Sequence, residues 1–217
     1  MRVIILAAGQ GFKLDGCNKI LLKDPKTNKM IIDQYIEIFS EFDITVVVGY
    51  KAIEIIQVHP NLNYIYNDEW NISNNSYSLG LALDDRPCIV LSADLFFDGM
   101  LIERIVQSLP NCILTENREN RELNSLNCSI NDENKIVEMY QGARHSSQDV
   151  EAIGIYKISD IDLLRNWKKN CFEHPNLFCG QNLKFDLADI FSIDLGNNRF
   201  EEVNNVIDYL RIIENNN

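Results

Sequence analysis

Short apolar runs rich in β-branched residues alternate with helical patterns throughout the first half of the chain. We predict strands at residues 3–6, 44–48, 64–66 and 88–91. Apolar residues at helical spacing predict helices at residues 30–39, 52–56, 77–83 and 100–109. Such alternation is typical of a mostly parallel sheet with helices on both faces. The predicted fold class is therefore α/β, a three-layer, Rossmann-like arrangement.

The pattern changes after residue 110, where we predict a small β-hairpin or cap inserted into the fold. The hairpin is expected at residues 126–130 and 135–139, and the polar segment 141–149 is expected to be a mobile loop over the site. The remaining predicted elements are strands at 152–158 and 200–203 and helices at 160–169, 184–191 and 206–214.

Composition narrows the class of partner. The 217-residue chain has 32 acidic and 20 basic residues, a net charge of −12, which argues against binding to nucleic acid or to an anionic membrane surface. Its six cysteines form no C-x-x-C pair, so reduced thiols are expected rather than a zinc site. The first apolar run is too short for a signal peptide, and no apolar stretch is long enough to span a bilayer. We therefore expect a cytoplasmic protein.

Two glycines and two lysines follow the first predicted strand. Gly9 and Gly11 lack side chains that would keep an anion from the backbone N–H groups, and Lys13 and Lys19 add positive charge. The spacing is not that of a P-loop, and Leu14 stands where a third dinucleotide-binding glycine would be, which disfavours a nicotinamide oxidoreductase. The alternative is a glycine turn flanked by two solvated lysines.

A carboxylate ends the fourth predicted strand. Asp94 would lie at the carboxyl edge of the sheet, near the glycine loop if the first and fourth strands are neighbours. One carboxylate, together with phosphate oxygens and water, is a usual environment for Mg²⁺. The alternative is that Asp94 or Asp98 caps the helix that begins near Met100.

The N-terminal segment L-A-A-G-Q-G-F-K-L…N-K-I-L-L resembles L-A-A-G-x-G-x-R-L…P-K-x-L-L. That pattern is the signature of nucleotidyltransferases that join a nucleoside triphosphate to a phosphorylated sugar or alcohol. The resemblance implies a GT-A-like fold in which Gly9, Gly11 and Lys13 hold the β- and γ-phosphates and Lys19 neutralises the α-phosphate. It also implies that Asp94 binds Mg²⁺. Two residues depart from the pattern: Lys13 replaces Arg, and Asn18 replaces Pro.

A second metal ligand is implied near the C-terminus. Residues 200–210 resemble the family pattern W-x-E-I-D-T-x-x-D-L, with Glu202 at the position of its Glu and Asp208 at that of its second Asp. The intervening Asp is Asn204 here, which can still coordinate Mg²⁺ through its amide oxygen but with less charge. The implied metal set is Asp94 with Glu202 or Asn204, and Asp208 is expected to be an ordinary helix residue.

The polar segment that opens the third predicted helix resembles the cytidylyltransferase branch, especially phosphocholine cytidylyltransferases. Its pattern N-N-x-x-S-L implies that Asn75 and Ser78 bind the pyrimidine, with backbone atoms of Leu6 and Ala8 completing the pocket. UTP and GTP remain open as nucleotides. The alternative is an Asn-rich turn in which Asn75 or Ser76 serves as the helix N-cap.

The resemblance implies one nucleotidyltransferase domain over residues 1–217, with a nucleotide-binding half (1–110) and an acceptor-binding or cap half (111–217). Acceptor-binding candidates are Tyr140, Arg144, His145, Glu151 and Lys157, although surface charge would explain most of them equally well.

The function expected is a Mg²⁺-dependent transfer from CTP to a small phosphorylated acceptor, of the phosphocholine, phosphonate or phospho-amino-acid type, for capsule or surface-polymer synthesis. Alternatives are a sugar-1-phosphate nucleotidyltransferase using UTP, GTP or dTTP, and a non-catalytic nucleotide-binding regulator. A homodimer is left open.

Overall fold

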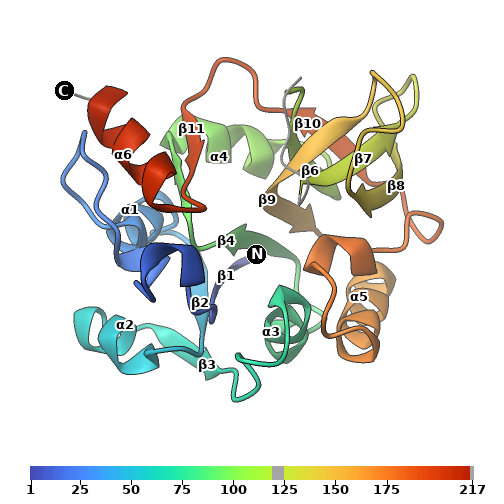
Figure 1. Ribbon diagram of the computed structural model, residues 1–217. Helices are drawn as coiled ribbons and strands as arrows, with labels where there is room; N and C mark the ends of the chain where they lie inside the picture. The colour runs from blue at the N-terminus through green and yellow to red at the C-terminus, as the bar shows by residue number, and fades with distance from the viewer. Residues whose placement is uncertain (119–124, 216–217) are drawn as a thin grey trace.

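A central sheet of nine strands lies between two layers of helices in the computed structural model, which describes residues 1–118 and 125–215 (Figure 1). Its main path runs β10-β6-β9-β4-β1-β2-β3. The bounds of these strands are β1 Arg2–Ala7, β2 Asp43–Val48, β3 Asn63–Tyr66, β4 Cys88–Ser92, β6 Cys112–Glu116, β9 Val150–Ile158 and β10 Phe191–Asp194. The pairs β1–β2, β1–β4, β2–β3 and β6–β10 are parallel, and β9 is antiparallel to β4 and β6. The predicted α/β class is confirmed.

Two smaller units complete the strand arrangement. Strands β7 (Leu126–Ile130) and β8 (Ile136–Gln141) form the predicted antiparallel hairpin, which joins the sheet through β9. Strands β5 (Leu95–Phe97) and β11 (Phe200–Glu202) form a separate two-stranded sheet. This pairing brings the C-terminal part of the chain beside the segment that follows β4.

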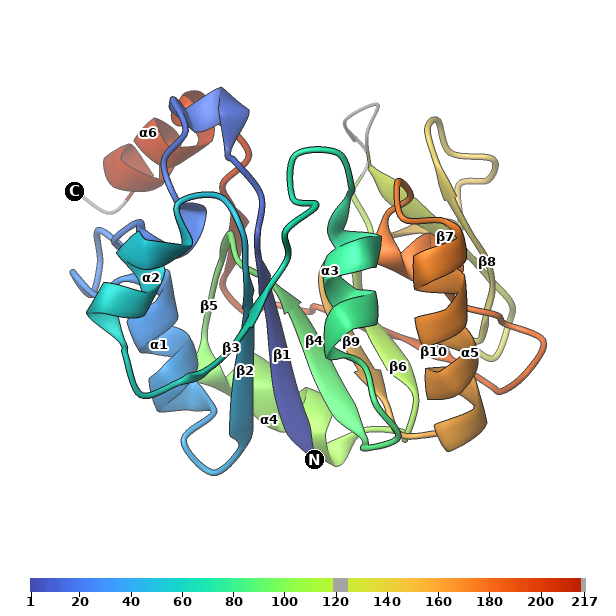
Figure 2. The ribbon, with the colours of Figure 1, turned by 90° about the horizontal axis from the view of Figure 1, so that it is seen from below.

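Helices cover both faces of the sheet because its central strand is apolar on both sides. Val3 and Ile5 of β1 belong to one core cluster, with α1 (Ile31–Ile38), α2 (Ala52–Val58) and α4 (Gly99–Gln107). Ile4 and Leu6 belong to the other, with α3 (Asn75–Ala82) and α5 (Ile161–Glu173). In Figure 2, α3 and α5 lie in front of the sheet and α4 lies behind it. The last helix, α6 (Val206–Asn215), packs through Ile212 against the first cluster.

One predicted helix is wrong. Residues 184–191 contain no helix; they run through turns into β10, which pairs with β6 at the edge of the sheet. The apolar residues of this segment are used for edge pairing and for contact with the hairpin, as the Ile136 N–H donates to the Ile190 carbonyl. Strands β5, β6 and β10 were not predicted. Within the described ranges, no helix has the length and apolar character needed to cross a membrane.

Lys157 on β9 is a buried cation beneath the C-terminal end of α4. Its ammonium donates to the carbonyls of Ile105, Val106 and Ser108 at 2.9–3.1 Å. The last carbonyls of a helix lack partners within the helix and carry its negative dipole end, so a buried ammonium satisfies both needs. Lys157 is therefore a structural group, and the expectation that it binds the acceptor is wrong.

We expect Lys157→Met to lower the free energy of unfolding by about 2 kcal/mol, because three carbonyls lose a charged donor. Urea denaturation at neutral pH measures this change. The control is Lys29→Met, which removes an exposed pair with Glu37 and should cost less than about 1 kcal/mol. Equal losses in the two variants would contradict this assignment.

Candidate active site

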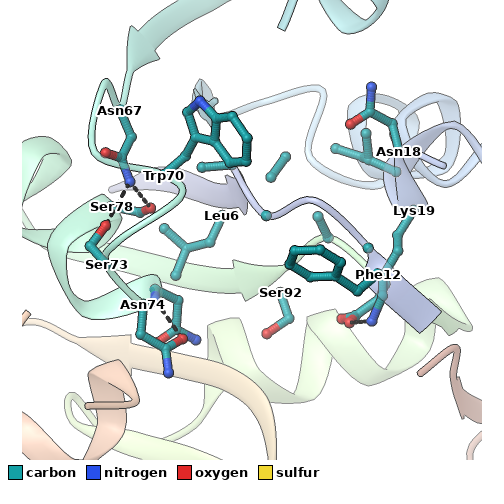
Figure 3. Close-up of a pocket in the computed structure, with 18 of the residues that line it drawn as sticks. Leu6, Phe12, Asn18, Lys19, Asn67, Trp70, Ser73, Asn74, Ser78 and Ser92 are labelled. Atoms are coloured by element: carbon teal, nitrogen blue, oxygen red, sulfur yellow. Dashed lines mark hydrogen bonds and ion pairs between the residues drawn. The ribbon is translucent and has the colours of Figure 1, made fainter. Parts of the chain in front are cut away.

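One cavity of about 360 Å³ opens at the carboxyl ends of β1 and β4 (Figure 3). It brings together ten of the eleven predicted site residues, namely Leu6, Ala8, Gly9, Gly11, Lys13, Lys19, Asn75, Ser78, Asp94 and Asn204. The eleventh, Glu202, is in β11 and pairs with Leu95 of β5, the residue that directly follows Asp94. Residues from the first strand and from the loop between β11 and α6 thus line one cavity.

The glycine loop has a fixed shape that other residues would not tolerate. Gly11 has φ of +59°, and a Cβ at this position would lie 2.6 Å from the Cys17 carbonyl oxygen. The Gly11 carbonyl accepts hydrogen bonds from the N–H groups of Leu14 and Gly16, so the loop folds back on itself. Lys13 is exposed at the edge of the cavity. The loop therefore presents backbone and one exposed cation to the cavity.

Lys19 and Asp94 form an ion pair inside the cavity. The Lys19 Nζ lies 2.8 Å from Asp94 Oδ2, and the two side chains are 22% and 16% exposed. The alternative of a solvated Lys19 is wrong, and so is the alternative that Asp94 caps α4. The residue at the N-cap of α4 is Asp98, whose side chain makes no capping hydrogen bond. We placed Asp94 near the glycine loop on the condition that the first and fourth predicted strands are neighbours. The pairing of β1 with β4 confirms that condition.

Asn18 connects the Lys19 segment to α2. Its buried amide donates to Glu54 Oε2 at 3.0 Å and to the Lys51 carbonyl at 3.4 Å. A proline at this position would fix the backbone but would lack these donors. Asn18 therefore lacks the rigidity of a proline ring, but its side chain binds the neighbouring helix α2.

A hydrogen-bonded network forms the opposite end of the cavity (Figure 3). Asn67 directly follows β3, and its buried amide donates to Ser78 Oγ at 2.9 Å and to Ser73 Oγ at 3.4 Å. Ser73 in turn donates to the Glu69 carbonyl. Because Ser78 accepts from Asn67, its own hydroxyl proton is the group left to donate to a ligand.

The start of α3 is capped by a residue other than those considered from sequence. Asn74 is the N-cap, and its side chain accepts from the Asn75 N–H, so the alternatives of Asn75 or Ser76 as the cap are wrong. Asn75 Oδ1 accepts from the Cys179 N–H at 2.8 Å. With its oxygen engaged, the Asn75 amide presents its NH₂ group as the end that can meet a ligand.

Sequence reasoning missed several residues that line the cavity: Phe12, Asn67, Trp70, Ser73, Asn74 and Ser92. Asn67 is a polar residue directly after a strand, the same signal that identified Asp94. Trp70 packs against Tyr50, with ring centroids 5.1 Å apart, and its place in the wall depends on this tertiary contact. Phe12 is 80% exposed with its ring facing the cavity (Figure 3), which no pattern predicts.

Glu202 has an unusual electrostatic environment. Burial raises its pKa from 4.5 to about 7, and the negative charges of Asp94 and Glu151 add to the shift. The charge of Lys19 and a hydrogen bond from Asn204 act in the opposite direction. Near neutral pH, Glu202 therefore exchanges a proton easily.

The residues present fit a divalent cation held chiefly by one carboxylate. Asp94 Oδ1 is buried and has no hydrogen-bond partner, an arrangement that a cation would relieve. In the described part of the chain, no group of three or more His, Cys, Asp or Glu side chains is arranged to hold a metal. Mg²⁺ commonly binds through one or two carboxylates and completes its shell with substrate phosphates and water. Asp94 would be the main protein ligand, with the Asn204 amide or Glu202 beside it.

Solved structures support the resemblance at the level of the fold. The CTP:phosphocholine cytidylyltransferase of Streptococcus pneumoniae superposes with a TM-score of 0.81 over 98% of this chain and 97% of that one, at 21% identity. An inositol-1-phosphate CTP transferase from T. maritima gives 0.73 over 98% and 94%, at 14% identity. No protein-family model matches the sequence, and a search of curated proteins returns no match. The fold is a nucleotidyltransferase fold.

Within this nucleotidyltransferase fold, the end of β8 and the loop between β8 and β9 carry three of the acceptor candidates. Tyr140 and His145 stack with ring centroids 3.7 Å apart, and Tyr140 donates to the buried Asp149 carboxylate. Asp149 also accepts from the N–H groups of His145 and Ser146. Arg144 donates to backbone carbonyls of the same loop and of residue 118. These side chains hold the loop together, so their first role is structural.

Glu151 is the remaining acceptor candidate. It stands at the start of β9, close enough to Glu202 to raise the pKa of that residue. Its Oε2 atom is buried and has no hydrogen-bond partner. With Asp94 and Glu202, it forms a group of three carboxylates, which we call the acidic cluster.

We expect Glu202→Gln to flatten the pH dependence of stability of the metal-free protein in EDTA. Between pH 4.5 and about 7, the folded protein holds a proton on Glu202 that the unfolded chain has released. The wild-type free energy of unfolding should therefore decrease as the pH rises through this range, by an amount on the order of 2 kcal/mol. The amide of the variant cannot titrate, so the stability of the variant relative to wild type should improve from pH 5 to pH 8.

Urea denaturation at the two pH values measures the difference, and Glu133→Gln, an exposed glutamate in the β7–β8 turn, is the matched control. Parallel curves for wild type and Glu202→Gln would show that burial of this carboxyl does not influence stability.

Proposed function

We propose that the protein is a Mg²⁺-dependent cytidylyltransferase that joins CTP to a small phosphorylated acceptor and releases pyrophosphate. The observation that carries the proposal is the Lys19–Asp94 pair, 2.8 Å apart at the carboxyl ends of two parallel strands, beside a glycine loop with an accessible backbone. A cation donor, a metal-binding carboxylate and an anion-binding loop in one cavity are the parts that phosphoryl-type transfer requires.

The proposed reaction needs positioning and charge neutralisation rather than a protein nucleophile. An oxygen of the acceptor phosphate attacks the α-phosphorus of CTP, the bond between the α-phosphorus and the bridging oxygen breaks, and pyrophosphate leaves. Gly9, Gly11 and Lys13 would hold the β- and γ-phosphates. Lys19 would neutralise the charge that develops at the α-phosphate. Mg²⁺ bound at Asp94 would supply further neutralisation of the phosphate oxygens.

The donors at the far end of the cavity favour cytosine as the base. The Asn75 amide and the Ser78 hydroxyl are both left with a proton to donate, because their acceptor atoms are engaged by Cys179 and Asn67. Cytosine presents two adjacent acceptors, its ring N3 and its O2, whereas uracil carries a proton on N3. Two neighbouring donors therefore match cytosine better than uracil.

The acidic cluster favours an acceptor with a positively charged head. Buried, unpartnered oxygens on Asp94 and Glu151 lie near Glu202, whose pKa these charges help to raise. Lys19 and a metal ion at Asp94 would compensate the charge of Asp94, which leaves the unpartnered Glu151 oxygen and the neighbouring Glu202 without a cation. A phosphorylated alcohol that carries an ammonium group, as phosphocholine does, would supply one. A neutral sugar 1-phosphate would not.

The experiment that tests the proposal is a matrix of CTP, UTP, GTP, ATP and dTTP against phosphocholine, 2-aminoethylphosphonate, phosphoserine and glucose 1-phosphate, followed by pyrophosphate release. We expect CTP with a cationic acceptor to give the highest kcat/KM. The matched control is 3,3-dimethylbutyl phosphate, which has the shape of phosphocholine without its charge and should be poorer by about tenfold or more.

Preference for UTP or dTTP with glucose 1-phosphate would replace the proposal with a sugar nucleotidyltransferase. Thermal stabilisation by a nucleotide without turnover of any pair would indicate a nucleotide-binding regulator.

We expect Lys19→Ala to lower kcat by roughly 10²-fold, because one transition-state donor is lost. Steady-state pyrophosphate release under saturating CTP and Mg²⁺ measures it. Lys29→Ala removes a lysine outside the cavity and should retain wild-type rates. A near-normal kcat for Lys19→Ala would remove Lys19 from the reaction.

A further inference from the structure

Asp94 lies in a tight turn between β4 and β5, and the turn is held from helix α1. Tyr35 is fully buried in α1, and its hydroxyl lies 2.9 Å from the Ser92 carbonyl and 3.0 Å from the Leu95 carbonyl. These carbonyls belong to the residues two before and one after Asp94. One side chain from outside the cavity therefore clamps both ends of the segment that carries the carboxylate.

The clamp is supported from two further directions. The Val203 N–H donates to the carbonyl of Asp94 itself, at 3.0 Å, and so attaches the turn to the segment after β11. On the opposite side, Gly154 of β9 has φ of +79°, and a Cβ there would lie 2.7 Å from Ser92 Oγ. The turn thus has little room to move toward β9.

The Tyr35 ring is fixed as well as its hydroxyl. It stacks on Phe97 with centroids 5.2 Å apart, so the phenol cannot follow the turn if the turn shifts. Burial raises the pKa of Tyr35 well above its usual value, and the nearby Asp94 charge adds to the shift, so the hydroxyl keeps its proton as a donor. Without that donor, the Ser92 and Leu95 carbonyls would lose the phenol proton that they share, and the turn would be held less firmly.

We propose that Tyr35 is a positioning residue that holds Asp94 in the orientation in which it receives Mg²⁺ with the triphosphate. The proposal rests on the proposed function in one respect, that Asp94 is taken as the metal ligand. Hydrogen-bond partners that orient a metal ligand commonly change metal affinity or activity by 10- to 100-fold when removed. Tyr35 would act one step further back, through the backbone that carries the ligand.

The test is Tyr35→Phe, which removes only the hydroxyl. Binding of CTP is measured with Mg²⁺ and again in EDTA, without acceptor, by the change in fluorescence of Trp70 in the cavity wall. We expect the gain in affinity that Mg²⁺ gives the wild type to shrink by about tenfold in the variant. Affinity for metal-free CTP should stay within about twofold, because the loop and base-binding residues are untouched.

The matched control is Tyr64→Phe, which removes a hydroxyl that donates to the His59 carbonyl away from the cavity. It should keep the full Mg²⁺ effect. A Tyr35→Phe protein with the same Mg²⁺ effect as wild type and Tyr64→Phe would overturn the proposal. So would a uniform loss of affinity with and without Mg²⁺, which would indicate general loosening of the fold.

Should Tyr35→Phe fail to fold at the assay temperature, Gly154→Ala tests the same turn from its other side. It should reduce the Mg²⁺ effect with Tyr35 intact, and an unchanged Mg²⁺ effect would overturn the proposal. A wild-type affinity for CTP that is independent of Mg²⁺ would also overturn it. Neither result depends on pyrophosphate release, so the positioning role and the proposed function can fail separately.

Discussion

The site depends on the register between β1 and β4. Leu6 pairs with Ser92 across these parallel strands, so the glycine loop that leaves β1 and the turn that leaves β4 begin at the same level. A shift of one residue would exchange the faces of β1 and move Val3 and Ile5 into the core cluster that now holds Ile4 and Leu6. The pairing of β1 with β4 thus fixes the distance between the loop and Asp94. The cavity follows from the packing of an apolar strand.

The segment that carries Lys19 is held at both ends by side chains far away in sequence. Before it, Asn18 is bound to Glu54 at the start of α2. After it, the buried Asp24 pairs with Arg199, at 2.7 Å, next to β11. Burial opposes ionisation of Asp24, but the Arg199 hydrogen bond is among the contacts that bring its pKa below the usual value. These links join the lysine segment to α2 and to the segment just before β11.

Sequence patterns predicted the alternating strands and helices of the fold and missed elements that depend on pairing at the edge of a sheet. Strands β1, β2 and β4 are buried apolar runs whose type is evident from composition, and they were found, whereas β5, with only three residues, was not. Residues 184–191 were mistaken for a helix, and β10 after them was missed, because the apolar residues of this segment meet β6 and the hairpin only in the folded chain. Candidate residues close to a strand end, such as Gly9 and Asp94, could be proposed from sequence. Trp70 could not, because Tyr50 places it.

The same distinction applies to single side chains buried away from the cavity. Lys157 looks like an acceptor-binding cation in the sequence, yet it is buried under α4, because the helix end needs a donor. Tyr35 looks like an ordinary core residue of α1, yet its hydroxyl reaches the turn that carries Asp94. The charge and polarity of a residue do not show, from sequence alone, on which face of the sheet its side chain will make its contacts. Topology decides that.

Asn204, which departs from the nucleotidyltransferase pattern at the proposed metal site, fits the charge balance around it. Asp94 and Glu151 already raise the pKa of Glu202, and Asn204 opposes the shift by a hydrogen bond. A carboxylate at position 204 would replace that donor with a further negative charge beside Glu202 and push the pKa of Glu202 higher still. The amide therefore lets Glu202 ionise near neutral pH. The charge that the proposed metal site lacks at residue 204 is offset by the charge that Glu202 is able to carry.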